Sequence, residues 1–389
     1  MNIAIFTDTF VPLTDGVVTS TVNLAKGLAD RGHTIYIVAP KFSKAKKFTY
    51  KNIHVRRSMG IPAFFYPGFK FTSVFNPRII KELKSKKIDV IHFQTPLTLG
   101  IQAISAAKLL KKPLVGTFHT LITDEQYIQH IVRKRKLVQR SLKKISWNYV
   151  RAYYDRCDLI TCPSESTKQE LIKNKLKKPI KVISNGIDLF SFDNTNWKKA
   201  KQKYHLNDKT ILFVGRITYE KNLSYLLDCF TLVVGKISDA KLLIVGDGPQ
   251  MKLLKEKIIR KKLSGNVILA GSIEHKALLA SGIFKACKIF ATTSTTETQG
   301  ISTLEAQANG LVCVGMDARG TKSLITNNEN GYLIKRDKKA FAEKIITLLS
   351  DEKLYRQMKK NTLGKIKKHD IRKVIDQWEE TYAALIHCN

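Results

Sequence analysis

The sequence predicts an α/β protein of two Rossmann-like, doubly wound parallel-sheet domains that face a cleft. The first observation is length, because 389 residues are enough for two domains of ordinary size. The second is that short apolar runs alternate with helical patterns, which is typical of βαβ units and parallel sheets. The third is that this alternation restarts after a polar segment near the middle of the chain. Parallel sheets bind ligands at the carboxyl ends of their strands, so we expect the functional residues in loops that follow strands.

The first series of elements begins at the N-terminus. Residues 3–6 are expected to form a buried strand, followed by a turn at residues 14–16 and an amphipathic helix over residues 18–28. Further buried strands are expected at residues 34–39, 89–93, 114–118, 159–162 and 180–183. We assign residues 1–190 to this first domain and place a linker at about residues 185–203.

The second series begins after this linker. Strands are expected at residues 210–214, 241–245, 267–270, 289–291 and 311–314, with helical patterns between them. We assign residues 191–370 to this second domain. In the remaining residues 371–389, Val374, Trp378 and Tyr382 recur at helical spacing. This spacing predicts an amphipathic C-terminal helix, which we expect to pack back on the first domain.

Charge is the most unusual property of the composition. The chain has 67 Lys and Arg against 32 Asp and Glu, a net charge of +35, which favours attraction to nucleic acid or to an anionic membrane. A general bias towards lysine would account for part of this excess. However, residues 31–81 contain eleven basic residues and no acid, and residues 126–154 contain eight and no acid. Such clustering favours a functional basic face on the first domain.

The sequence shows no membrane span or secretion signal. No run approaches the ~20 apolar residues of a transmembrane helix. The N-terminal residues have no basic segment and reach an acid at Asp8. The six cysteines have neither paired spacing nor histidine partners at zinc spacing, which favours reduced, buried thiols in a cytosolic protein.

The strongest motif runs from Glu297 to Glu305. A carboxylate follows a predicted strand, and a glycine turn at Gly300 leads into a helix that we expect to begin near Ile301. The N–H groups and dipole of a helix N-terminus favour a phosphate at that position. Glu305 lies one turn into the helix, where it could accept hydrogen bonds from a ribose diol. The alternative is an ordinary capping arrangement with two acids that face solvent.

Three weaker motifs also follow predicted strands. Arg216 and Lys221 lie after Gly215 and can converge on a diphosphate, the first as a planar fork and the second as a point charge. Gly16, in the first strand-to-helix turn, would let the backbone approach a phosphate or sugar, although the turn lacks GxGxxG. His119 ends another strand, and it is either a cleft residue or a structural histidine. No DxD pair is present, so no metal site is expected.

Together these motifs resemble the retaining family 4 glycosyltransferases of the GT-B fold. Glu-x7-Glu and Gly-Arg-x4-Lys-Asn occur in order with the Ser-Asn-Gly-Ile-Asp run at residues 184–188 and the Val-Gly-Asp-Gly-Pro run at residues 245–249. The resemblance covers essentially the whole chain. One departure is Gln-Gly-Ile-Ser at residues 299–302, where many relatives have Phe-Gly-Leu-Val. Its effect on donor choice is open.

The resemblance implies a role for each donor-site residue. Glu305 should hold the ribose, Gly300 and Ile301 should offer backbone N–H groups to the diphosphate, and Glu297 should contact the donor sugar. In the same way, Arg216 and Lys221 should neutralise the leaving nucleotide.

Two residues of the first domain also gain a role from the resemblance. His119 should line the reacting centre, and Gly16 should sit against the phosphate. The acceptor of such enzymes often attacks from the face of the leaving group, so no side-chain nucleophile is assigned.

Within this family, the opening residues 6–20 and the Thr-Phe-His-Thr run at residues 117–120 look most like bacterial diacylglycerol glycosyltransferases, which are monotopic membrane enzymes. Residues 131–150 could form a basic amphipathic helix that lies in a membrane interface, or an ordinary surface helix. Residues 64–71 form an aromatic loop that suits the headgroup level of a bilayer, or core packing. The expected membrane-facing residues are Phe64, Phe65, Phe69, Arg133, Lys134, Arg135, Lys136, Arg140, Lys143 and Lys144.

The resemblance therefore implies a metal-independent transferase that moves glucose or galactose from a UDP-sugar to 1,2-diacylglycerol, with an α product. UDP-hexose would be a co-substrate, and no cofactor is expected. The expected location is the cytoplasmic face of the membrane, as a peripheral protein. Alternatives are transfer to a soluble or lipid-linked glycan, a nucleotide-sugar epimerase, and a nucleic-acid-binding protein, for which no helix-turn-helix, zinc-finger or RNP pattern is present. The sugar, the base, the identity of the acceptor, the anomeric outcome and the oligomeric state stay open.

Overall fold

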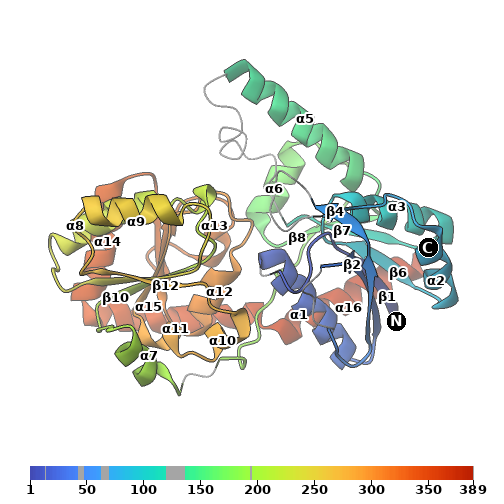
Figure 1. Ribbon diagram of the computed structural model, residues 1–389. Coiled ribbons are helices and arrows are strands. Elements are labelled where there is room, and N and C mark those ends of the chain that lie inside the picture. Colours follow the sequence, from blue (N-terminus) through green and yellow to red (C-terminus); the bar gives the residue numbers. More distant parts are fainter. Residues whose placement is uncertain (14, 43–47, 63–69, 120–135, 193–194, 389) are drawn as a thin grey trace. The chain divides into compact units, whose positions relative to one another are not determined.

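The computed structural model describes residues 1–13, 15–42, 48–62, 70–119, 136–192 and 195–388, with only the backbone of residues 136–140 (Figure 1). The chain forms two compact units. The first unit comprises Met1–Gly186 together with Ile371–Asn389, and the second unit comprises Ile187–Asp370. The chain thus leaves the first unit within the segment where the sequence places the junction, and its last helix returns to the first unit.

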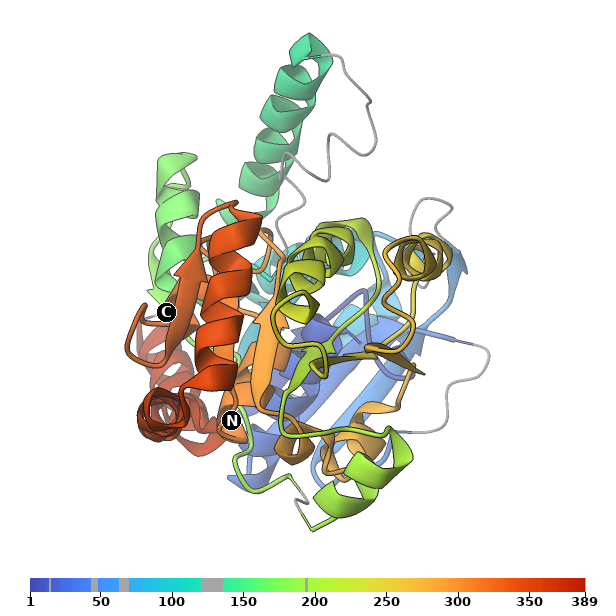
Figure 2. The same ribbon diagram turned by 90° about the vertical axis from the view of Figure 1, so that its left-hand side faces the viewer.

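The first unit contains a seven-stranded parallel sheet in the order β3-β2-β1-β6-β7-β8-β9 (Figures 1 and 2). The order reverses between β1 and β6, which makes their carboxyl ends the topological switch point of the sheet. The strands are β1 (Asn2–Phe6), β2 (Thr34–Pro40), β3 (Ile53–Ser58), β6 (Val90–Phe93), β7 (Leu114–Thr117), β8 (Leu159–Cys162) and β9 (Ile180–Val182). The helices are α1 (Gly16–Asp30), α2 (Pro77–Ser85), α3 (Thr98–Leu110), α5 (Lys136–Tyr154), α6 (Glu165–Lys173) and α16 (Ile371–His387).

Both faces of this sheet are covered, which explains the continuous apolar runs of its central strands. On one face, Phe6 and Phe93 pack with apolar side chains of α2, α3 and α5. On the other face, Ile3 and Ile5 pack with α1 and with α16, whose Val374, Ile375, Trp378 and Tyr382 are buried. Gly27 lets α1 and α16 approach closely, because a Cβ there would collide with Ile375.

Local capping explains where two helices of the first unit begin. Asp15 caps α1, since its carboxylate accepts a hydrogen bond from the N–H of Val18. The N-cap residue of α3 supplies no side-chain cap, and Asp8 at the end of β1 takes this role by accepting from the N–H of Leu99 (3.0 Å). Burial raises the pKa of Asp8 to about 6. The carboxyl end of β1 therefore fixes the start of α3.

Strands β4 (Gly60–Pro62) and β5 (Lys70–Thr72) form a separate antiparallel hairpin. The sequence did not predict this hairpin or the edge strand β3. None of the helices that the structure describes is long and apolar enough to cross a membrane.

The second unit contains a six-stranded parallel sheet in the order β12-β11-β10-β13-β14-β15, with its switch point between β10 and β13. The strands are β10 (Thr210–Val214), β11 (Lys241–Val245), β12 (Val267–Gly271), β13 (Ile289–Thr292), β14 (Val312–Met316) and β15 (Gly331–Ile334). The helices are α7 (Trp197–Lys203), η1 (Tyr219–Lys221), α8 (Leu223–Val234), α9 (Met251–Arg260), α10 (His275–Leu279), α11 (Ile283–Ala286), α12 (Ile301–Ala308), α13 (Thr321–Leu324), α14 (Lys338–Ser350), α15 (Glu352–Lys365) and η2 (Ile366–His369).

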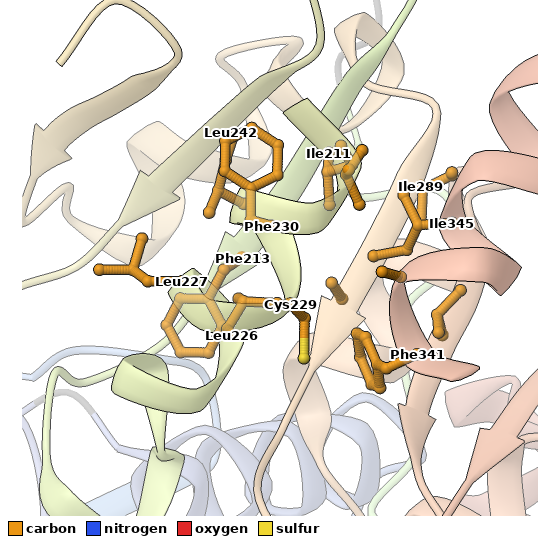
Figure 3. Packing of buried hydrophobic residues seen from close by; sticks show 14 of the residues in the cluster. Ile211, Phe213, Leu226, Leu227, Cys229, Phe230, Leu242, Ile289, Phe341 and Ile345 are labelled. Atoms are coloured by element: carbon orange, nitrogen blue, oxygen red, sulfur yellow. The ribbon is translucent and has the colours of Figure 1, made fainter. Parts of the chain in front are cut away.

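Alternate residues of the central strand β10 fill the two cores of this unit. Ile211 and Phe213 pack with Phe230 of α8 and Phe341 of α14 on one face (Figure 3). Leu212 belongs to the cluster on the opposite face. Two parallel sheets with helices on both faces confirm the predicted α/β class.

Candidate active site

The two loops at the switch point of the second unit bring oppositely charged side chains together. Lys221 follows β10 and Glu297 follows β13, and the Lys221 ammonium forms an ion pair with Glu297 Oε1. Both side chains remain partly exposed, Lys221 by 24% and Glu297 by 20%. The sequence separates these residues by 76 positions. Their meeting follows from the strand order, which places β10 beside β13.

Arg216 lies on the same loop as Lys221 and is exposed. The loop after β11 supports this loop through backbone contacts. A Cβ at Gly246 would collide with the carbonyl oxygen of Gly215, and one at Gly248 would collide with that of Ile217. The N–H of Ile217 also donates to the carbonyl oxygen of Asp247 (2.9 Å). Gly246 and Gly248 of the Val-Gly-Asp-Gly-Pro run therefore let the backbone of this loop approach the backbone of the basic loop closely.

Gly300 caps helix α12 in the left-handed region, with φ of 89°, and has no side chain to occupy the space in front of the helix. The helix then begins at Ile301, as the sequence predicts. The N–H groups of the first turn of a helix lack intrahelical acceptors, and the dipole adds partial positive charge there. Glu297 lies four residues before Ile301, and a Cβ at Gly300 would lie 3.8 Å from its Cγ, so the predicted phosphate site is next to the Lys221–Glu297 pair.

Glu305 is buried in α12, with 4% of its surface exposed. Its Oε1 lies 2.5 Å from Nε2 of His275, the first residue of α10. The hydrogen bond to Glu305 raises the pKa of His275, against an opposing effect of burial. His275 was not predicted from the sequence. The only signal was a histidine in a loop that follows strand β12, and many structural histidines share that position.

His119 lies just beyond β7 in the first unit. Its Nε2 is 2.6 Å from Oε1 of Gln94, which follows β6. Burial lowers the pKa of His119 to about 4, so the ring is neutral at physiological pH. Both residues line a small pocket with Ser20, Asn185 and Trp378. Gln94 and Asn185 were not singled out as pocket residues by the sequence.

Gly16 is exposed at the first position of α1, next to the Asp15 cap. It therefore lies after β1, on the same side of the first unit's switch point as Gln94 after β6. Other expected residues lie outside the described residues, namely Phe64, Phe65, Phe69, Arg133, Lys134 and Arg135. Of Lys136 and Arg140 only the backbone is described, in α5.

Helix α5 has a buried face and a solvent-exposed face, and the apolar residues of the expected amphipathic helix do not share one of them. Trp147 and Tyr154 are buried, whereas Lys144 is exposed, Lys143 is partly exposed and Ile145 is 61% exposed. The N-terminal part of this helix extends away from the sheet of the first unit in both views (Figures 1 and 2).

Large apolar side chains are exposed around the β4–β5 hairpin. Met59 and Ile61 are 75% and 76% exposed, and Val74 and Phe75 are about half exposed, at 48% and 49%. Contiguous exposed apolar side chains are typical of interaction surfaces. The sequence pointed to the aromatic loop between these strands but not to the flanking residues.

Both halves of the chain match models of glycosyltransferase families. Residues 14–190 match the model of Glycosyltransferase Family 4, and residues 194–364 match that of Glycosyl transferases group 1. The chain is 31% identical over 340 residues to alpha-monoglucosyldiacylglycerol synthase of Streptococcus pneumoniae, covering 86% of this chain and 75% of that protein. It is 27% identical over 347 residues to the protein of the same name from Acholeplasma laidlawii, covering 87% and 85%.

Solved structures share the fold at low sequence identity. The structure of Anabaena HepE with UDP and glucose matches with a TM-score of 0.76 and 18% identity, covering 99% of this chain and 100% of that one. Sucrose-phosphate synthase from Thermosynechococcus elongatus matches with a TM-score of 0.78 and 17% identity, covering 100% of both chains.

Proposed function

We propose that this chain, which belongs to the family 4 glycosyltransferases of the GT-B fold, transfers glucose or galactose from a UDP-sugar to 1,2-diacylglycerol. The observation that carries this proposal is the cluster at the switch point of the second unit, where Lys221, Glu297 and the start of α12 come together. The membrane location, the sugar and the stereochemistry belong to the same proposal.

Each part of a nucleotide sugar has a chemical counterpart in this cluster. The diphosphate needs positive charge and N–H donors, which Lys221, Arg216 and the first turn of α12 supply. The ribose hydroxyls need a buried acceptor, and Glu305 is a buried carboxylate one turn further along α12. Glu297 precedes that helix and is suited to accept hydrogen bonds from hydroxyls of the donor sugar.

The transfer requires stabilisation of the leaving nucleotide. As the bond from the anomeric carbon to the phosphate oxygen breaks, negative charge develops on the diphosphate. Lys221 and Arg216 would stabilise this charge most strongly in the transition state. The acceptor hydroxyl would attack from the same face and transfer its proton to the released phosphate oxygen, giving an α product. These cations would also let the reaction proceed without a divalent ion.

Diacylglycerol is proposed as the acceptor because two relatives bear the name alpha-monoglucosyldiacylglycerol synthase. Two surfaces of the first unit support a lipid acceptor. The hairpin exposes Met59 and Ile61, and α5 exposes Lys144 and Ile145. Apolar side chains beside cations suit the interface of an anionic bilayer. The net charge of +35 adds a long-range attraction to such a surface.

The proposal is tested by incubating the full chain with labelled UDP-glucose or UDP-galactose and vesicles of diacylglycerol with anionic phospholipid. Label should enter the organic phase as a monohexosyl lipid, and this transfer should continue in the presence of a chelator. Lys221→Ala provides the matched inactive control. Label that stays in the aqueous phase with every vesicle composition would contradict a lipid acceptor, and transfer to an added glycan would favour the soluble-glycan alternative.

A further inference from the structure

We infer that Gln94 is a positioning residue for His119, which it holds with the proton on Nε2 so that Nδ1 is the nitrogen that accepts hydrogen bonds. This role deepens the proposed function and rests on it, because the resemblance to the family 4 glycosyltransferases implies that His119 lines the reacting centre. Nothing in the family resemblance assigns Gln94 a role. Its assignment comes from a buried chain of side chains in the first unit.

The side chains of His119 and Gln94 are within hydrogen-bond distance. His119 Nε2 lies 2.6 Å from Gln94 Oε1, and Gln94 is 1% exposed. An amide oxygen only accepts hydrogen bonds, so Nε2 of His119 must be the donor. A neutral imidazole carries one N–H, and a proton on Nε2 leaves Nδ1 as the acceptor.

On the side away from His119, the amide group of Gln94 contacts the ring of His92. The amide nitrogen lies 3.1 and 3.2 Å from the two ring nitrogens of His92, which is completely buried. These ring nitrogens also have hydroxyl partners, Tyr382 at 2.7 Å from Nδ1 and Thr117 at 2.6 Å from Nε2. In the structure the amide nitrogen of Gln94 therefore occupies the side of His92, and the amide oxygen occupies the side of His119.

Helix α16 holds the His92 ring in place through contacts with Tyr382 and Trp378. Tyr382 of α16 is fully buried, and the ring of Trp378 lies 5.0 Å from that of His92. Burial lowers the pKa of His92 to about 3 and that of His119 to about 4. Both rings are therefore neutral at physiological pH, and the hydrogen bond to Gln94 Oε1 favours the proton of His119 on Nε2. With Nδ1 as acceptor, His119 is suited to receive a hydrogen bond from a substrate hydroxyl.

Gln94→Met tests this role because it keeps the shape of the side chain and removes the acceptor oxygen. One net hydrogen bond changes the population ratio of the two His119 tautomers by up to about a factor of ten. We expect nitrogen NMR of the histidine-labelled full chain to show His119 as the Nε2–H form in the wild type and as a mixture of tautomers in the variant. His119→Gln identifies the resonances. The same variant should lower kcat about tenfold and leave KM for the donor unchanged, since most of the expected donor residues, Lys221, Glu297 and Glu305 among them, lie in the second unit.

Gln102→Met is the matched control, because Gln102 is another buried glutamine, on α3, whose amide donates to the carbonyl oxygen of Ser73. It should change neither the His119 resonances nor kcat. The inference is overturned if wild-type His119 carries its proton on Nδ1, if Gln94→Met keeps the wild-type spectrum and rate, or if Gln102→Met lowers kcat equally. An Nε2–H form in a protein that transfers no sugar would instead reject the proposed function and leave the tautomer assignment intact.

Discussion

The Lys221–Glu297 ion pair predicts a substitution that moves nucleotide binding and turnover in opposite directions. In the second unit Lys221 is paired with Glu297, so a diphosphate must compete with that carboxylate for the ammonium group. Glu297→Gln removes the competing charge and keeps the length of the side chain. The pair is only 20–24% exposed, and such a pair contributes about 1 kcal/mol. The variant should therefore bind UDP about fivefold more tightly.

Turnover should change in the opposite sense. Loss of the proposed contact between Glu297 and the donor sugar should lower kcat at least about tenfold, as for removal of a preorganised group. Calorimetric titration of UDP into the wild type, Glu297→Gln and Lys221→Ala separates the two effects. Lys221→Ala should weaken UDP binding at least about tenfold, because a charge-assisted hydrogen bond is lost. If Glu297→Gln binds UDP no more tightly than the wild type, the pair does not compete with the nucleotide.

Glu305→Ala should weaken binding of the UDP-sugar by about 1.5–3 kcal/mol, and an unchanged affinity in a donor titration would contradict its ribose role. His275→Ala should lower the free energy of unfolding by about 1 kcal/mol at pH 6. Glu305 raises the pKa of His275 above 6.5, so this stabilisation is complete below pH 6.5 and is lost as the pH rises through the folded pKa; chemical denaturation at pH 6 and pH 9 checks the difference. Replacing the basic run at residues 133–136 by glutamates should abolish sedimentation with anionic vesicles, at about 1 kcal/mol per cation, and wild-type sedimentation of this variant would make the run an ordinary solvated surface.

The central strands were predictable because they are buried on both faces. Ile3 to Phe6 and Ile211 to Phe213 are almost inaccessible, so they read as continuous apolar runs. Strand β3 lies at the edge of its sheet, and its exposed His54 and Arg56 alternate with the partly buried Val55 and Arg57. Strand β3 therefore lacks the continuous apolar run by which the central strands were predicted. The β4–β5 hairpin escaped prediction because its exposed Ile61 and Phe71 do not mark a buried face.

The location of the candidate site was predictable where its residues directly follow strands of a parallel sheet. The loops after β10 and β13 were identified in this way, and their residues Lys221 and Glu297 meet in the structure. The pairing of His275 with Glu305 depends on the packing of α10 beside α12, which no local pattern encodes. The same holds for Gln94 and Tyr382, which are 288 residues apart in the chain and contact the same His92 ring.

Transfer of a hexose to diacylglycerol with retention is distinguished from its alternatives by the structure of the lipid product. The lipid made from UDP-hexose and diacylglycerol vesicles can be extracted and its anomeric proton examined by NMR. We predict a single monohexosyl diacylglycerol with the α configuration of the donor, formed by the wild type and absent with Lys221→Ala. A β-linked lipid would contradict retention, and the absence of any hexosyl lipid while UDP is released would contradict diacylglycerol as the acceptor.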